Sequence, residues 1–244
     1  MLLVLPLPTF AFVCTADFFP VGNVLAFVQT MFQDNLNTVF AGFQPTGVTA
    51  TVVAECVART PVGGDLETDL DWVRIDATVA ALRDRHRADL VSALVPSADG
   101  CGLGYENFPV AASDDAWAFS VVKASCALDN YSFAHELGHN FGMRHDRVEE
   151  DAATSDTCNY GHFFPLRIFQ IERQVRSVLA YGDGCDGCPR IGVYSSPLKV
   201  DLGIIEIGPM GVSCDAPADA NGRFTRANNR QLLIDAAPTV AAFR

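Results

Sequence analysis

Residues 135–146 read H-E-L-G-H-N-F-G-M-R-H-D, and this stretch constrains both the fold and the chemistry of the chain. His135 and His139 are four residues apart, so on a helix both imidazoles leave the same face and can bind one metal ion. Glu136 follows the first histidine, where its carboxylate can reach a water bound to that metal and act as its general base. The stretch therefore predicts a helix that carries a zinc site on one face.

The third histidine of the stretch, His145, lies six residues beyond His139. A continuous helix would carry it away from the metal, but Gly142 can adopt left-handed backbone angles without steric cost, so the helix can end and the chain can turn back. Three protein nitrogens and one open position are the arrangement of a catalytic zinc site. Three of the five histidines fall in this window, whereas His86 and His162 are isolated and are expected to be ordinary surface or hydrogen-bonded side chains.

The extended pattern resembles the zinc motif of the metzincin metallopeptidases, and Asp146, directly after the third histidine, resembles their adamalysin, or reprolysin-like, branch. The similarity runs from about residue 45 to about residue 200. It implies a five-stranded sheet with three main helices, a substrate cleft above one catalytic zinc ion, and a metalloendopeptidase that hydrolyses peptide bonds in a peptide or protein. The stretches similar to bacterial members are 88–95 (ADLVSALV), 118–122 (AFSVV), 132–139 (SFAHELGH), 176–185 (RSVLAYGDGC) and 190–197 (RIGVYSSP).

The resemblance also assigns roles to residues outside the histidine stretch. The family places a methionine in a tight turn beneath the zinc, and the matching position holds Leu179, which is close to methionine in volume. Tyr181 matches a catalytic tyrosine whose hydroxyl helps to stabilise the transition state, with a packed tyrosine in a turn as the alternative. Arg190–Pro197 would shape the pocket for the residue after the scissile bond. Ala116–Val122 would be the exposed edge of the sheet, where a peptide adds as a strand, or else an ordinary covered strand.

Eight cysteines, at positions 14, 56, 101, 126, 158, 185, 188 and 214, permit four disulfides and favour an oxidising compartment. The family resemblance suggests that Cys101 pairs with Cys126. Cys185 and Cys188 form a C-x-x-C, and because no second C-x-x-C exists to complete a zinc site, a structural disulfide is favoured over a redox role. The chain is therefore expected to be secreted or extracellular, although residues 1–13 lack the basic start of a signal peptide.

Hydrophobic periodicity predicts an α/β (α+β) fold with a mostly parallel sheet. The apolar segment Leu2–Leu7 is either a first buried strand or a truncated export signal. Residues 147–244 are expected to form an irregular, cysteine-containing subdomain of one catalytic domain over 1–244, with a cleft between it and the subdomain 1–146. The other predicted elements are helices over 24–40, 71–87 and 131–142, strands over 47–55, 89–95 and 116–122, loops over 59–69 and 97–115, and a helix near 227–243 that Pro238 interrupts or ends.

Composition excludes several classes of partner. The net charge is −12 and the basic residues are not clustered, which argues against nucleic acid. No segment is long and apolar enough to span a bilayer. The acidic run Glu149, Glu150 and Asp151 is expected to be a solvated loop; a calcium ion would suit oxygen ligands, but no loop of the right pattern supports one. The oligomeric state is left open.

Two alternatives compete with a catalytic zinc endopeptidase. In the first, the chain is a protein-binding module that keeps the zinc without turnover; Leu179 is the only support for it, and the presence of Glu136 argues against it. In the second, the three histidines hold a structural zinc ion. A structural site normally closes with a fourth protein ligand, and none is evident in the neighbouring sequence.

Overall fold

The computed structural model describes residues 9–15, 22–43, 45–57, 64–96 and 98–244, which form two compact units. The first unit comprises residues 1–37, 47–142 and 236–244, and the second comprises residues 38–46 and 143–235. The chain passes from the first unit to the second after Gly142, close to the boundary predicted at residue 146. The prediction that both halves make up one catalytic domain stays a prediction. The segment Leu2–Leu7 lies outside the described residues.

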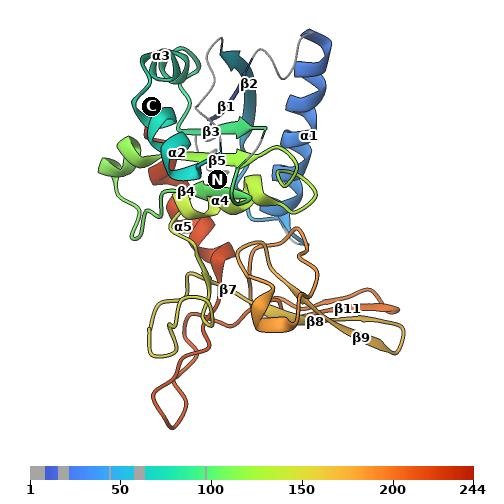
Figure 1. Ribbon diagram of the computed structural model, residues 1–244. Coiled ribbons are helices and arrows are strands. Elements are labelled where there is room, and N and C mark those ends of the chain that lie inside the picture. The colour runs from blue at the N-terminus through green and yellow to red at the C-terminus, as the bar shows by residue number, and fades with distance from the viewer. Residues whose placement is uncertain (1–8, 16–21, 44, 58–63, 97) are drawn as a thin grey trace, which may run out of the picture. The chain divides into compact units, whose positions relative to one another are not determined.

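A five-stranded sheet forms the centre of the first unit (Figure 1). Four strands pair in parallel and the short β4 pairs antiparallel with β5 at one edge. The predicted strand Ala116–Val122 is therefore not the exposed edge of the sheet, because β4 covers it. The sheet order is β2 (Thr51–Val57), β1 (Thr9–Thr15), β3 (Leu90–Val95), β5 (Phe119–Lys123) and β4 (Gly102–Gly104).

The helix predicted over 71–87 is two helices, α2 (Leu66–Ile75) and α3 (Ala77–His86). Asp76 separates the two helices because it caps both of them: it is the C-cap of α2 and the N-cap of α3. Its backbone N–H donates to Trp72 as the last bond of α2. Its carboxylate accepts from the backbone N–H groups that begin α3, at 2.8 and 3.2 Å. The predicted loop over 59–69 therefore ends early, since α2 begins at Leu66.

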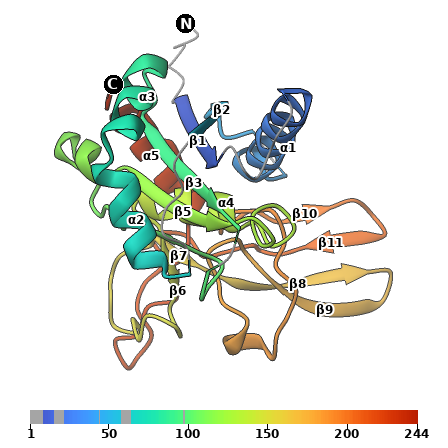
Figure 2. The ribbon, with the colours of Figure 1, turned by 45° about the horizontal axis from the view of Figure 1, so that its top comes forward.

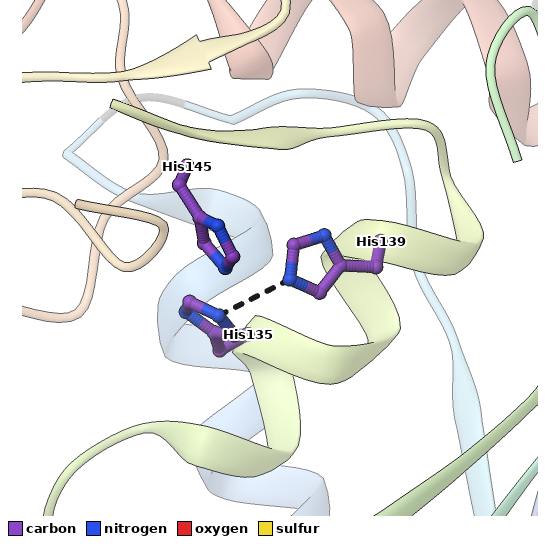
Figure 3. Close-up of side chains that lie close together, drawn as sticks. All are labelled: His135, His139 and His145. Carbon is purple, nitrogen blue, oxygen red and sulfur yellow. Dashed lines mark hydrogen bonds between the residues drawn. The ribbon is translucent and has the colours of Figure 1, made fainter. Parts of the chain in front are cut away.

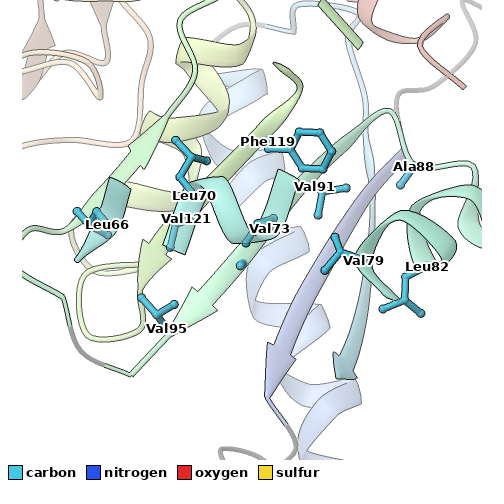
Figure 4. Close-up of a cluster of buried hydrophobic side chains, with 11 residues drawn as sticks. Leu66, Leu70, Val73, Val79, Leu82, Ala88, Val91, Val95, Phe119 and Val121 are labelled. Carbon is cyan, nitrogen blue, oxygen red and sulfur yellow. The ribbon is translucent and has the colours of Figure 1, made fainter. Parts of the chain in front are cut away.

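Helices cover both faces of this sheet (Figure 2). Alternate residues of β3, such as Val91 and Val95, pack against α2 and α3 in one buried apolar cluster (Figure 4). On the other face lie α1 (Gly22–Ala41) and α4 (Ser132–Asn140), whose Phe32 and Phe133 rings meet edge to face at 4.8 Å. The predicted helix over 24–40 is confirmed as α1.

The second unit contains more regular structure than the sequence predicted. A four-stranded antiparallel sheet and a two-stranded parallel pair occupy the part expected to be irregular. The strands thus divide among three sheets, although the mixed α/β class is confirmed. The bounds are β6 (Arg144–Asp146), β7 (Tyr160–Gly161), β8 (Phe163–Ile168), β9 (Ile171–Arg176), β10 (Val200–Asp201), β11 (Ile205–Ile207) and the 3-10 helix Asp183–Cys185; the first unit adds the 3-10 helix Ala112–Trp117.

The last helix, α5 (Asn229–Val240), continues through Pro238. The expected interruption is therefore wrong: the helix runs two residues beyond the proline and ends at Val240. Among the described residues no helix is long and apolar enough to cross a membrane.

The side chains that the structure describes form three disulfides: Cys101–Cys126, Cys158–Cys214 and Cys185–Cys188. The first confirms the pairing implied by the family resemblance, and the third shows that the two cysteines of the C-x-x-C are joined, while the structural role of this disulfide stays a prediction. Two further cysteines, Cys14 and Cys56, occupy paired positions in the parallel strands β1 and β2. Cross-links are thus present in both units, which supports a chain that folds in an oxidising compartment.

The apolar cluster between α2 and the sheet should dominate the stability of the first unit. Leu70 is 4% exposed, whereas Ile75 on the same helix is 68% exposed. We expect Leu70→Ala to lower the free energy of unfolding by about 2–5 kcal/mol and Ile75→Ala to lower it by less than about 0.5 kcal/mol. Urea unfolding followed by circular dichroism measures both, and equal losses would contradict this packing.

Candidate metal centre

The helix α4 presents two histidines on one face, as the sequence predicted. All nine of its residues are buried, and its His135 and His139 side chains point toward each other with 3.2 Å between their Nε2 atoms (Figure 3). Two nitrogens bound to one tetrahedral zinc ion lie about 3.3 Å apart, given Zn–N bonds of about 2.0–2.1 Å. The pair is therefore arranged as two ligands of a single ion.

The chain reverses direction where the sequence predicted. Gly142 has φ +82°, a left-handed conformation, and a Cβ there would lie 2.7 Å from the carbonyl oxygen of Asn107. Only glycine adopts this left-handed conformation without strain and also lacks the Cβ that would clash with Asn107. The chain then enters β6, where the backbone N–H of Arg144 donates to Asn159 at 2.7 Å. This strand carries His145.

The structure brings the three predicted ligands together. One ring nitrogen from each of His135, His139 and His145 lies within 4.8 Å of the others (Figure 3). In the described part of the chain no other group of three or more histidine, cysteine, aspartate or glutamate side chains is placed to hold a metal ion. The carboxylates of Glu149, Glu150 and Asp151 therefore do not form such a group in that part of the chain.

The electrostatic environment suits a metal ligand. Burial lowers the pKa of His145 to about 4, with smaller contributions from neighbouring charges. The imidazole is consequently neutral at neutral pH and has a ring lone pair for a metal ion. Three imidazole nitrogens are a donor set that zinc prefers, so the residues present fit the ion.

Glu136 lies next to this cluster beneath a glycine-rich edge strand. Its side chain is 5% exposed, and a Cβ at Gly102 would lie 2.6 Å from its Oε1 atom. A Cβ at Gly104 would lie 2.8 Å from its backbone oxygen. Gly102 therefore leaves the space that the carboxylate occupies, and Gly104 leaves the space that the helix backbone occupies. This contact was not predicted, because residues 97–115 were expected to form a loop.

Comparison with known proteins identifies the family to which this arrangement belongs. The family model described as metallo-peptidase family M12 (Reprolysin_5) matches residues 15–174, which include all three histidines and Glu136. The chain belongs to the metallo-peptidase family M12. This agrees with the metzincin, reprolysin-like resemblance of the histidine motif.

Several relatives in this family carry the name peptidyl-Asp metalloendopeptidase. One from Stenotrophomonas maltophilia (strain R551-3) is 30% identical over 229 residues, which cover 91% of this chain and 49% of the relative. The one from Pseudomonas fragi is 30% identical over 122 residues, covering 50% of this chain and 64% of the relative. The chain thus spans about half the length of the first of these relatives.

A solved structure described as "Structure of a chaperone-substrate complex" shares the fold. It aligns with a TM-score of 0.65 and 16% sequence identity over 97% of this chain and 38% of that chain. At this identity the similarity shows the fold alone.

In this member of family M12, Glu150 fixes the third histidine. Its Oε1 atom lies 3.0 Å from Nδ1 of His145 and also accepts from the backbone N–H of that residue at 3.3 Å. Its Oε2 atom lies 3.5 Å from a guanidinium nitrogen of Arg144. With Nδ1 donating to the carboxylate, Nε2 is the nitrogen left for a metal ion. The prediction of a solvated acidic loop is wrong for Glu150, whose side chain is 17% exposed.

Asn140 attaches the end of α4 to the edge of the sheet. Its side-chain amide donates to the carbonyl of Tyr105 at 2.9 Å and to that of Phe119 at 3.1 Å. The backbone N–H of Asn107 donates in turn to the carbonyl of His139 at 3.1 Å. The helix that carries two of the histidines is therefore held at its C-terminal end by β4, β5 and the loop after β4.

The segment expected to form a tight turn does so. The backbone N–H of Ala180 donates to the carbonyl of Ser177 at 3.1 Å, and Leu179 is fully buried. Tyr181 is 38% exposed, and its ring meets the ring of His145 edge to face at 4.6 Å. Its backbone N–H donates to Oδ2 of Asp146 at 3.0 Å. The tyrosine thus lies beside the third histidine rather than packed away from it.

The two isolated histidines lie outside the metal cluster, as expected. The Nε2 atom of His86 is 2.6 Å from a carboxylate oxygen of Glu55. His162 is half-buried, and burial lowers its pKa. Among the residues that the structure describes, neither belongs to a group of three or more side chains that could hold a metal ion.

The contact between Glu150 and His145 predicts a measurable effect on metal affinity. We expect Glu150→Ala to raise the Kd for zinc by about 10–100-fold, because the ligand loses the partner that orients it. Glu149→Ala, next in sequence but exposed, should leave the Kd unchanged. Competition with a chromophoric chelator measures both values. Equal Kd values for Glu150→Ala and wild type would contradict the orienting role.

Proposed function

We propose that this member of family M12 is a zinc-dependent endopeptidase whose metal ligands are His135, His139 and His145. The observation that carries the proposal is the convergence of three imidazole nitrogens, two of them 3.2 Å apart, with a buried carboxylate on the residue after the first ligand. One zinc ion per chain is the expected cofactor.

A zinc ion held by these imidazoles would supply a Lewis acid that polarises the scissile carbonyl and makes attack by water feasible near neutral pH. The residues of the chain provide proton transfer and the orientation of the metal-binding imidazole. Glu136 accepts the proton of the attacking water and passes it to the leaving amine. Glu150 keeps His145 in the tautomer that offers Nε2.

Tyr181 is the candidate for a second catalytic group. Its exposed side chain lies against the ring of His145, which supports a role in which its hydroxyl donates a hydrogen bond to the oxygen that becomes negative in the transition state. The packed-tyrosine alternative would require a more buried ring.

We infer the substrate class from the relatives. They are named peptidyl-Asp metalloendopeptidases, and we propose that this chain cleaves the peptide bond between a residue and a following aspartate in a peptide or protein. The three disulfides support a working place outside the cytosol, in the extracellular space.

Two alternatives make different predictions. A structural zinc site would have a fourth protein ligand, but the group in the described residues has three members. An inactive zinc-binding module would retain metal without turnover, and Leu179 in place of methionine is the only feature in its favour. The two residues are close in volume, and the leucine is fully buried in the turn.

Replacement of the proposed general base separates these functions. We expect Glu136→Gln to lower kcat for an aspartate-containing peptide by at least about 10²-fold while the chain still binds one zinc ion. The control Glu67→Gln changes a carboxylate in the first turn of α2 and should leave kcat unchanged. Mass spectrometry of the products and metal analysis measure both quantities. Cleavage that survives in Glu136→Gln would contradict the mechanism, and wild type with zinc but no cleavage would favour the inactive module.

A further inference from the structure

One peptide group in the turn beside the third histidine is held at both of its ends. This peptide joins Ala180 to Tyr181. Its N–H donates to the Oδ2 atom of Asp146 at 3.0 Å, and its carbonyl oxygen accepts from the Nη1 atom of Arg176 at 2.6 Å. Hydrogen bonds of a carboxylate or a guanidinium are roughly twice as strong as those between neutral groups. The plane of this peptide is therefore fixed by two side chains.

The carboxylate that holds the N–H end is itself immobile. Asp146 is 2% exposed, and its Oδ1 atom accepts from the backbone N–H groups of Val148 at 3.0 Å and Glu149 at 3.2 Å. These bonds attach the carboxylate to the loop that follows the third histidine. The N–H end of the peptide is thus tied to the segment that carries His145.

The guanidinium that holds the carbonyl end connects two segments of the chain. The Nε atom of Arg176 donates to the carbonyl oxygen of Cys188 at 2.9 Å, while its Nη1 atom donates to that of Ala180. Cys188 is in turn joined to Cys185 by a disulfide. A planar guanidinium carries five N–H donors in fixed directions, so one arginine can make both bonds at once.

The backbone of Arg176 is also fixed, on both of its sides. Arg176 is the last residue of β9 and pairs with Phe163 of β8. Its N–H donates to the carbonyl of Pro189 at 3.0 Å, and its own carbonyl accepts from the N–H of Ile191 at 2.9 Å. The guanidinium therefore starts from a rigid position. Arg190 donates to the Ala180 carbonyl as well, at the longer distance of 3.3 Å.

The orientation of this peptide determines where the side chain of Tyr181 points. Its ring meets the ring of His145 at 4.6 Å between centroids. The hydroxyl lies at the far end of a long, stiff side chain, so a small rotation of the peptide displaces it. A displacement of about 1 Å in a catalytic group can cost about 10²-fold in rate.

We propose that Arg176 is a positioning residue, which holds the Ala180–Tyr181 peptide so that the tyrosine hydroxyl reaches the oxygen that becomes negative in the transition state. This inference rests on the proposed function, in which Tyr181 is the second catalytic group. Arg176 acts through Tyr181, and the bond-breaking step is left to Glu136 and the metal.

A double-mutant cycle measures whether Arg176 acts through the tyrosine. Tyr181→Phe should lower kcat for an aspartate-containing peptide by about 10²-fold, because one transition-state donor is lost. Arg176→Met keeps an apolar stem and removes every N–H donor. It should lower kcat by at least about tenfold, with KM and the Kd for zinc unchanged. In the Tyr181→Phe background, Arg176→Met should change kcat by less than about twofold, because the group that it positions is already absent.

Arg226 provides a matched control in the same unit. Its guanidinium also donates to two backbone carbonyls, those of Ala216 at 2.6 Å and Asp156 at 2.7 Å. Arg226→Met therefore removes the same number of hydrogen bonds away from the turn. It should lower Tm but leave kcat unchanged, with or without Tyr181→Phe. If Arg226→Met lowers kcat as Arg176→Met does, the assignment to Arg176 is wrong.

A purely structural role for Arg176 gives a different result. In that case Arg176→Met lowers kcat by the same factor with and without Tyr181→Phe, or raises the Kd for zinc, and either outcome overturns the proposal. Arg176→Lys keeps the charge but cannot bridge both carbonyls. It should remain folded with zinc bound and should lower kcat less than Arg176→Met. Loss of zinc or of the folded state in Arg176→Lys would also overturn the positioning role.

Failure of the proposed function is distinguishable from failure of this inference. Wild type that holds zinc but cleaves neither the peptide nor an unfolded protein refutes the proposed function, and with it this inference. Wild type whose cleavage is lost in Glu136→Gln but retained in full in Tyr181→Phe refutes only the role of the tyrosine and the positioning by Arg176.

Discussion

The structure depends on bringing three imidazoles to one point, although the third lies beyond the end of the helix that carries the first two. Helical spacing aligns His135 with His139, and their Nε2 atoms lie 3.2 Å apart. The third ligand requires the chain to reverse within a few residues, which Gly142 permits with its φ of +82°. The close approach of Asn107 to this glycine excludes any side chain there. Much of the nearby structure serves to hold this reversal in place.

Two groups of contacts hold the helix and the histidine that follows it. On the helix, Asn140 donates to two carbonyls of the sheet edge, which prevents α4 from shifting along the sheet. After the reversal, Glu150 accepts from Nδ1 of His145 and determines which ring nitrogen is left for a metal ion. Buried polar contacts of this kind are costly to break. They hold the three histidines in place through the fold of the chain.

The sequence predicted the parts of this arrangement that follow from local spacing. The histidine pair, the reversal at Gly142 and the amphipathic α1 all follow from local rules about periodicity and backbone freedom. Glu150 was misjudged because its neighbours in the acidic run are exposed, and only the three-dimensional path of the loop turns this one carboxylate inward.

The strand β4 was missed because three residues with two glycines carry no hydrophobic alternation; its stability comes from pairing with β5. The break at Asp76 was missed because the apolar positions on either side of it keep an approximately helical spacing, while the cap is a polar, local effect.

The family and the overall class were also predictable, since the motif is long and specific, whereas the antiparallel sheet of the second unit was not. Strand β9, for example, has a run of exposed residues and only one fully buried position, so its pattern gives little signal.

X-ray absorption spectroscopy of the zinc-loaded chain tests the central claim most directly. Three imidazole nitrogens and one further light-atom ligand, at about 2.0–2.1 Å, are expected, and His145→Ala should lower the number of imidazole ligands from three to two. A sulfur ligand at about 2.3 Å, or a spectrum that His145→Ala leaves unchanged, would contradict a metal centre built from His135, His139 and His145.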